Sequence, residues 1–220
     1  HNVAHSFPTR RSSDLELVLQ TPGSTSRRLA TDMQEILSAR GLQPSDLDLL
    51  VASVGPGSFT GVRITLAAMK GLAFALHKPL ACVPSLDALA RPLLGRGAVV
   101  LAALDARRSE LYASAFGPDG VPLLEAVAIA PRAAAEAIRD ACPGLPVLGV
   151  GEGVLAYRDA LRDVLGDRLQ IAAAPDHAIR ASVLIQVALE HGLPPTPAAD
   201  AEPLYLRRSE AEVLRDAKTA

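Results

Sequence analysis

Apolar positions along the chain recur at two spacings, which together predict a mixed α/β protein. Leu29, Met33 and Leu37 repeat at helical spacing, and Gly41 is placed to end that helix. Residues 47–54 instead form a short apolar run with little alternation, as is typical of a strand buried on both faces. The whole pattern predicts helices at residues 24–40, 60–77, 86–94, 131–141, 154–165 and 181–191, and strands at 17–19, 47–54, 80–83, 98–105, 110–116 and 147–150.

The order of these elements predicts two α/β lobes. A pair of strands followed by strand-helix units occurs twice along the chain. We place the first lobe at residues 16–96, the second at 97–200 and a carboxyl-terminal tail at 201–220. Residues 193–203 contain four prolines and predict a linker that leads to the tail.

Composition adds limits on function. The 220-residue chain is 49% hydrophobic and 21% charged, which predicts a globular protein of one or two compact lobes. Its formal net charge of -2 gives no large positive field for direct binding of nucleic acid. Cys82 and Cys142 lack metal or redox spacing and are interpreted as buried thiols. Because we find neither an apolar run long enough to span a membrane nor a signal-peptide pattern, we expect a cytoplasmic protein.

Residues 55–63 read Gly-Pro-Gly-Ser-Phe-Thr-Gly-Val-Arg and predict a shaped turn between a buried strand and a helix. Backbone N–H groups and the positive end of the helix dipole would converge there, which suits either an anion site or a tight connection without a ligand. No Lys-Ser/Thr pair follows the last glycine, so the block is not a Walker motif. The turn residues are Gly55, Pro56, Gly57, Ser58, Phe59, Thr60, Gly61 and Arg63, with Ser58 or Thr60 as the helix cap.

A second glycine turn, at Gly149, Gly151 and Gly153, follows the predicted strand 147–150. It could contact a nucleotide, but we favour a close-packed corner between strand and helix because the motif is weak by itself.

Other polar residues give weaker signals. Asp105 and its charged neighbours could belong to a metal nuclease, but further carboxylates to share an ion are not evident and a charged hairpin turn is favoured. His77, His177 and His191 are isolated and are interpreted as surface or helix-end residues. We therefore predict no metal site.

Several motifs in the same order resemble the TsaB (YeaZ) family. The block at 55–63 is followed by Gly-Leu-Ala at 71–73 and Lys-Pro-Leu at 78–80. The resemblance continues through Leu-Asp-Ala-Arg-Arg-Ser-Glu-Leu-Tyr at 104–112, the second glycine turn, and Pro-Leu-Tyr-Leu-Arg-Arg at 203–208. It extends from about residue 16 to the carboxyl end. It implies a Gcp-like domain with the actin-like, ribonuclease-H-like fold, which is duplicated into two lobes.

TsaB is the non-catalytic subunit of the bacterial machinery for N6-threonylcarbamoylation of adenosine 37 in tRNA. The resemblance implies a scaffold that pairs with the catalytic subunit TsaD, is joined by the ATPase TsaE, contacts tRNA only through the complex and has no cofactor of its own. A homodimer, and ATP or ADP at the interface of the complex, remain open. In TsaD the stretch matching residues 83–90 carries two metal-binding histidines, whereas Ser85 and Leu89 stand here. We therefore expect no catalysis by this chain.

Ala67, Gly71 and Ala75 form a ridge of small side chains at four-residue spacing. A glycine within a helix costs about 1 kcal/mol relative to alanine, which favours a packing role. A helix buried in its own lobe would show the same pattern, but in TsaB the two first-lobe helices pack on TsaD. We therefore expect a partner surface of about 1,600 Å². Its predicted residues are Leu29, Met33, Leu37, Ala67, Met69, Gly71, Phe74 and Ala75.

Residues 1–15 depart from the family, which begins with an apolar strand. Residues 5–15 resemble one translated frame of a short-read sequencing adapter, so we interpret residues 1–15 as non-native. The first lobe would then lack its native first strands and would have an unpaired sheet edge.

Two alternative functions come from other classes. An actin or sugar-kinase-like phosphotransferase would bind magnesium nucleotide, but a clear acidic residue beside the first glycine turn is not evident. A glycoprotease-like metallopeptidase is disfavoured by Ser85 and Leu89.

Overall fold

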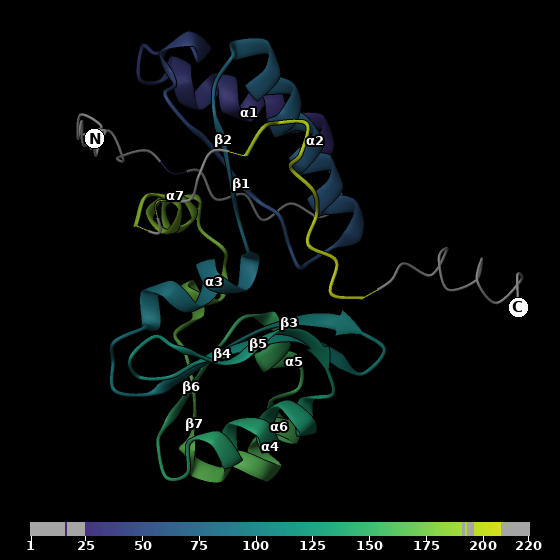
Figure 1. Ribbon diagram of the computed structural model, residues 1–220, viewed down its shortest axis with the longest axis vertical. Helices are drawn as coiled ribbons and strands as arrows, with labels where there is room; N and C mark the ends of the chain where they lie inside the picture. Colours follow the sequence, from purple (N-terminus) through teal and green to yellow (C-terminus); the bar gives the residue numbers. More distant parts are fainter. Residues whose placement is uncertain (1–15, 17–24, 191, 193–195, 208–220) are drawn as a thin grey trace, which may run out of the picture.

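The structure is a computed structural model that describes Glu16, residues 25–190, Gly192 and residues 196–207. These residues form two α/β lobes stacked along the long axis of the molecule (Figure 1). The strand predicted at 17–19 and the interpretation of residues 1–15 both lie outside the described residues.

The first lobe is built on a two-stranded parallel sheet with helices on both faces (Figure 1). Alternate residues of the strands point to opposite faces, so each strand contributes to two apolar clusters. Leu50, Ala52 and Leu80 face one helix, whereas Ala81 and Val83 face another. The elements are α1 (Thr25–Ser38), β1 (Leu50–Ser53), α2 (Phe59–Leu76), β2 (Leu80–Val83) and α7 (Ala181–Glu190), with α2 on the first face and α7 on the second.

The second lobe contains a five-stranded sheet with the strand order β5-β4-β3-β6-β7. Strand β4 pairs antiparallel with both β5 and β3, whereas β6 is parallel to β3 and β7. The strands are β3 (Val99–Arg107), β4 (Glu110–Phe116), β5 (Pro122–Ile129), β6 (Val147–Val150) and β7 (Leu169–Ile171). The helices of this part of the chain are α3 (Ser85–Ala90), α4 (Pro131–Ala141), α5 (Glu152–Ala156) and α6 (Arg158–Leu165).

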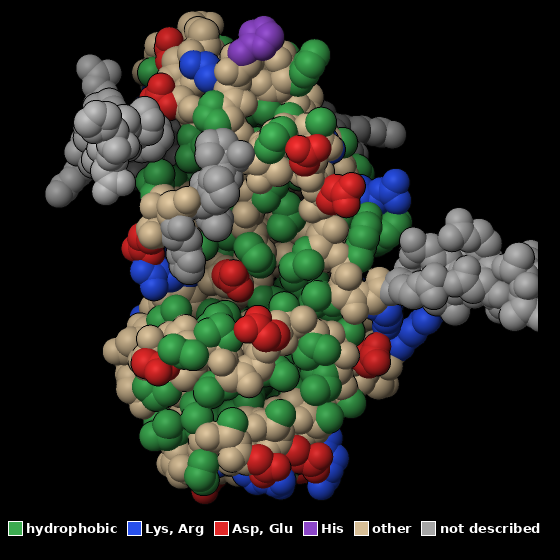
Figure 2. Space-filling view, in the orientation of Figure 1, with side chains coloured by type: hydrophobic (Ala, Val, Ile, Leu, Met, Phe, Trp, Pro, Cys, Tyr) green, Lys and Arg blue, Asp and Glu red, His purple; other side chains and the backbone are tan. Residues whose placement is uncertain are grey.

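Strand β3 is the centre of the second lobe because both of its faces are buried. Val99 and Leu101 pack in the cluster that contains residues of α4 and α6, whereas Val100 and Ala102 pack in the cluster that contains residues of α3. This explains the continuous apolar run in its sequence. Acidic and basic side chains gather at the outer end of the lobe, over α4 and α6 (Figure 2).

The predicted limits of four elements are confirmed, namely β2, β4, α4 and β6. The strand predicted at 47–54 is shorter, because only Leu50–Ser53 pairs with β2. The helix predicted at 154–165 is divided into α5 and α6 at Tyr157, whose φ of -116° and ψ of 25° interrupt it. Strands β5 and β7 were not predicted.

The predicted lobe boundaries need a correction. Helix α7, which we placed in the second lobe, packs on β1 and β2 of the first. The predicted linker also returns to the first lobe, where Thr196 N donates to Leu80 O at 2.8 Å. The boundary is therefore not a single cut in the sequence, because α7 and the segment that begins at Thr196 pack on the first lobe.

Residues 196–207, here called the return segment, run beside α2 and reach the second lobe (Figure 1). Lys70 of α2 donates hydrogen bonds to the carbonyls of Ala199 and Ala201 at 3.0 and 2.9 Å. Leu204 N donates to Val54 O at 2.7 Å, and Arg207 pairs with Glu110 of the β3–β4 hairpin at 2.9 Å. The return segment therefore joins both lobes.

Replacing Lys70 by Met should lower the free energy of unfolding by about 1–3 kcal/mol, because two hydrogen bonds from a charged donor are lost. Lys78→Met is the matched control, since the Lys78 ammonium makes no hydrogen bond within the described part of the chain and only its backbone N–H donates, to Ala73 O. Urea unfolding of both variants would measure the difference. Equal losses in the two variants would contradict the role of Lys70.

Candidate partner-binding surface and glycine turns

Helix α2 turns a face of small and apolar side chains to solvent. Ala67, Gly71 and Ala75 are exposed, and a Cβ added at Gly71 would meet no atom within 4 Å. Phe74 lies beside them and is 77% exposed. The predicted ridge therefore lies on the surface of the described structure, although its role in binding a partner remains a prediction.

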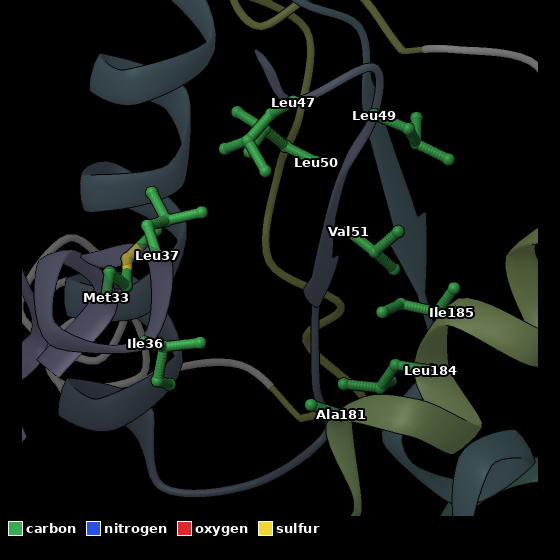
Figure 3. Close-up of a pocket in the computed structure, with 10 residues that line it drawn as sticks. All are labelled: Met33, Ile36, Leu37, Leu47, Leu49, Leu50, Val51, Ala181, Leu184 and Ile185. Atoms are coloured by element: carbon green, nitrogen blue, oxygen red, sulfur yellow. The ribbon is translucent and has the colours of Figure 1, made fainter. Parts of the chain in front are cut away.

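The other four predicted partner residues do not share this exposed face. Met69 is 9% exposed and packs in the first-lobe core. Leu29, Met33 and Leu37 are half-buried, and the latter two line an apolar groove between α1, β1 and α7 (Figure 3). Their helical spacing marks the inward stripe of an amphipathic helix. Met69 is buried and is removed from the candidate partner surface, whereas Leu29, Met33 and Leu37 stay predicted partner residues on α1, apart from the exposed face formed by Ala67, Gly71, Phe74 and Ala75.

Helix α2 is apolar on nearly all sides. By length and composition alone it could cross a membrane, with a mean hydropathy of 1.3 over Phe59–Leu76, so the expectation that no segment qualifies is wrong. A core helix of a soluble protein passes the same test. In α2, however, only 17% of the residues from Phe59 to Leu76 are buried within the described structure. Since a helix that is apolar all round is normally buried all round, the outer face of α2 lacks a cover among the residues that the structure describes.

The first glycine turn is held by the backbone of two distant segments. Gly55 has a φ of +99° and its carbonyl accepts a hydrogen bond from Ser85 N at 2.7 Å. The carbonyl of the preceding Val54 accepts from Leu204 N, and a Cβ at Gly55 would lie 3.3 Å from Leu204 O. Ser58 is the cap of α2, because its Oγ accepts from Gly61 N at 3.3 Å. The turn therefore joins the first lobe, α3 and the return segment.

Phe59 connects this turn to an aromatic contact that the sequence did not reveal. Its ring stacks on Tyr205 with 5.4 Å between centroids, and Arg63 lies over the Phe59 ring at 5.0 Å. Phe59 and Tyr205 are each nearly half exposed. No sequence pattern links residues so far apart, so only the fold could identify this pair.

The second glycine turn is filled by the protein itself. A Cβ at Gly151, whose φ is +100°, would lie 2.1 Å from Ala103 O, and one at Gly153 would lie 2.7 Å from the Leu104 carbonyl carbon. All three of its glycines are buried. This geometry is that of a strand-to-helix corner packed closely on β3. Contact with a nucleotide at Gly149, Gly151 and Gly153 is therefore unsupported by the space around them.

His177 is the last residue of a short 3-10 helix, Ala174–His177, so its interpretation as a surface or helix-end residue is right about the helix end, but it is not isolated, because it fastens this corner. Its Nδ1 accepts a hydrogen bond from Gly151 N at 3.0 Å, and its Nε2 lies 3.0 Å from Ala172 O. The first contact requires an unprotonated Nδ1, so the ring is neutral with its proton on Nε2. Both partners are backbone atoms, and for this reason the sequence carried no signal of the contact.

The comparisons with known proteins agree with one another. A family model described as "TsaD: tRNA N6-adenosine threonylcarbamoyltransferase" matches residues 24–213. The tRNA threonylcarbamoyladenosine biosynthesis protein TsaB of Bacillus subtilis is 31% identical over 189 residues, which cover 82% of this chain and 78% of that protein. The chain belongs to the TsaB (YeaZ) family. Escherichia coli TsaB is 35% identical over a shorter match, 44% of this chain and 43% of that protein.

Solved structures support the same family and its actin-like fold. A Pseudomonas aeruginosa protein described as similar to peptidase YeaZ superposes with a TM-score of 0.65 and 28% identity. The match covers 82% of this chain and 83% of that one.

Ser85 and Leu89, which stand where the TsaD resemblance places histidines, are both engaged in packing. Ser85 is 3% exposed and its Oγ lies 2.7 Å from Ser53 Oγ. Leu89, on α3, is 1% exposed and packs against the sheet of the second lobe. Neither side chain offers a good ligand for a transition metal. In the described residues, no group of three His, Cys, Asp or Glu side chains is placed to hold a metal ion.

Asp105 stabilises the β3–β4 hairpin in this TsaB-family chain. Its carboxylate accepts hydrogen bonds from Arg107 N at 2.8 Å and from the Tyr157 hydroxyl at 3.3 Å. Burial raises the pKa of Tyr157, and the Asp105 charge and hydrogen bond raise it further. Arg107, Arg108 and Ser109 all have positive φ, between 53° and 61°. The acidic group thus stabilises an unusual turn.

Gly151→Ala should lower the free energy of unfolding by about 3 kcal/mol or more, because the new methyl group meets Ala103 O and the backbone has positive φ. Gly71→Ala is the matched control and should stabilise the chain by up to about 1 kcal/mol, since its site is open. Urea unfolding measures both. A Gly151→Ala protein as stable as the wild type would refute the packed corner.

His177→Ala should cost about 1–3 kcal/mol, because the buried Gly151 N–H loses its acceptor. His177→Gln should recover much of this loss, since a side-chain amide can accept from Gly151 N and donate to Ala172 O. Thermal unfolding at pH 7.5 compares the two. If Ala and Gln variants lose the same stability, His177 does not act through these hydrogen bonds.

Proposed function

We propose that this chain is the accessory, non-catalytic subunit that supports N6-threonylcarbamoylation of adenosine 37 in bacterial tRNA. Its support begins with the relatives, several of which are named for tRNA threonylcarbamoyladenosine biosynthesis. In this proposal the chain is cytoplasmic and acts as a scaffold for the catalytic subunit TsaD. The ATPase TsaE joins the pair, and tRNA contacts this chain only through the complex.

The observation that carries the proposal is the uncovered face of α2. Ala67, Gly71 and Ala75 leave a shallow path at four-residue spacing, along which another helix can approach closely. The neighbouring Phe74, 77% exposed, supplies a large apolar side chain of the kind that anchors protein interfaces. A helix from the partner, laid along this face, would bury the side of α2 that its own lobe leaves in water. A second copy of this chain could use the same face, so a homodimer is part of the proposal.

The proposed accessory role is supported by the residues at the two positions where TsaD carries histidines. Ser85 and Leu89 are committed to packing, so they would not supply the metal ligands expected in the catalytic relative. A phosphotransferase has little support, because His177 already uses the Gly151 N–H and protein atoms fill the space beside Gly151 and Gly153. Any ATP or ADP in the complex would therefore lie at its interface with the partner.

Gly71→Leu and Ala75→Leu should each weaken pairing with the same organism's TsaD by ~10-fold or more, equivalent to about 1.4 kcal/mol. Both side chains would project from the open face, so the variants should remain folded. Co-purification and a tRNA modification assay with the wild-type chain as reference measure pairing and function. Ala133→Leu, an exposed change on α4, is the matched control and should have no effect.

Two results would overturn the proposal. Folded Gly71→Leu and Ala75→Leu proteins that pair normally would remove α2 as the interface. Threonylcarbamoylation by this chain without TsaD would show that it is catalytic.

A further inference from the structure

Arg63 stands at one end of the exposed face of α2. It precedes Ala67 by four residues and Gly71 by eight, so its side chain leaves the helix on the same line as the ridge of small residues. At 1.5 Å of rise per residue, Arg63 lies about 12 Å along the helix axis from Gly71. Arg63 is itself exposed. The face along which we place a partner helix therefore ends in a cation.

Two aromatic rings hold the Arg63 guanidinium in place. Its Cζ lies 5.0 Å from the centroid of the Phe59 ring, and that ring stacks on Tyr205 of the return segment at 5.4 Å. The hydrogen bond from Leu204 N to Val54 O, at 2.7 Å, fixes the backbone beside Tyr205. Attraction between a cation and the face of a ring leaves the N–H donors of a guanidinium available for a further partner. We call Arg63, Phe59 and Tyr205 the arginine–aromatic cluster.

The charge of Arg63 is not matched by a carboxylate in the part of the chain that the structure describes. Its guanidinium makes neither an ion pair nor a hydrogen bond there. Helix α2 contains no Asp or Glu, and its other charged residue, Lys70, already donates to the carbonyls of Ala199 and Ala201. The N–H donors of Arg63 are thus available to an acceptor from another molecule.

The surroundings of the arginine–aromatic cluster favour a protein as that molecule. Phe59 is 46% exposed and Tyr205 is 49% exposed, and the small residues of the ridge continue from Arg63. Tyr and Arg are enriched among the residues that dominate the energetics of protein interfaces. The backbone of a nucleic acid instead requires several cations along one path, and Lys70 is committed to the return segment.

A second copy of this chain matches the cluster poorly. If two α2 helices packed along their ridges, each Arg63 would face a helix whose only charged residues are Arg63 and Lys70. Like charges brought together at an interface weaken it. A helix of a different protein that carries a carboxylate avoids this repulsion and can accept two parallel hydrogen bonds from the guanidinium.

We propose that Arg63, held on Phe59 and Tyr205, binds a carboxylate of the partner helix that lies along the α2 ridge. This inference rests on the proposed function and names the contact that selects the partner and sets its position along α2. Because about 12 Å separates Arg63 from Gly71, the Asp or Glu stands about two turns from the point where the partner helix crosses Gly71.

Pairing of the full chain with the same organism's TsaD tests the contact. Arg63→Glu should raise the Kd by at least ~10-fold, because it places two carboxylates together. Arg63→Lys keeps the charge but loses the planar fork, so its Kd should lie between those of the wild type and Arg63→Glu. Titration calorimetry measures the Kd, and thermal unfolding checks that each variant is folded. Arg162→Glu, the same reversal at an exposed arginine of α6, is the matched control and should leave the Kd unchanged.

A charge swap gives a readout that a merely structural role of Arg63 would not change. The exposed Asp and Glu residues on the helices of TsaD are changed to Arg one at a time. One of these changes should weaken pairing with the wild-type chain and restore pairing with Arg63→Glu. Absence of any such rescue overturns the proposal.

Gly71→Leu separates the failure of this inference from the failure of the proposed function. If Gly71→Leu weakens pairing and Arg63→Glu does not, the α2 face is the interface and the Arg63 contact is overturned. If neither variant weakens pairing, or if the wild-type chain does not pair, both are overturned. An Arg63→Glu change that weakens only self-association, or only the retention of tRNA by an intact pair, would assign Arg63 to a second copy or to an RNA phosphate and overturns the proposal equally.

Discussion

The return of residues 196–207 to the first lobe is the constraint on which the arrangement of the two lobes depends. The first lobe contains only a two-stranded sheet among the described residues, which by itself gives little cooperative stability. Lys70 and Val54 hold the return segment along α2 and the first glycine turn. Arg207 then ties the same segment to the hairpin of the second lobe. The return segment is therefore structural, and it contacts both α2 and the first glycine turn.

This constraint also fixes which side of α2 is available. The return segment and β1 take the side that carries Lys70 and Met69. The ridge of Ala67, Gly71 and Ala75 remains on the side that neither covers. The apolar composition of the helix is thus explained by two faces with different covers, one within the chain and one that we assign to a partner. Without the return segment, Lys70 would lose its two carbonyl acceptors, while Met69 would still pack with β1.

The sequence predicted elements well where a single strong pattern decided them. β2, β4, α4 and β6 each have an apolar run or helical stripe bounded by Gly, Pro or charged residues, and their limits were correct. β5 and β7 escaped because one is a partly exposed edge strand and the other has only three residues. The lobe boundary failed for a different reason: α7 packs on strands more than ninety residues earlier, and no local pattern records such a contact.

The candidate partner surface was also predicted from the sequence only in part. The spacing of Ala67, Gly71 and Ala75 was readable, but helical spacing alone could not separate that ridge from the inward stripe of Leu29, Met33 and Leu37. Both consist of small or apolar side chains four residues apart. What separates them is the position of β1, which is a property of the tertiary fold.

Gly71 and Gly151 show why a glycine motif does not by itself identify a ligand site. A methyl group at Gly151 would collide with Ala103 O, so that glycine is required by the chain's own packing. A methyl group at Gly71 would meet no atom within 4 Å, so packing among the described residues gives no reason to accept the cost of glycine in a helix. Gly151, in the turn that resembles a nucleotide loop, is therefore explained by packing within the chain. Gly71, in an ordinary helix, is not explained by packing among the described residues. A partner helix packed on α2 would explain why a glycine stands there.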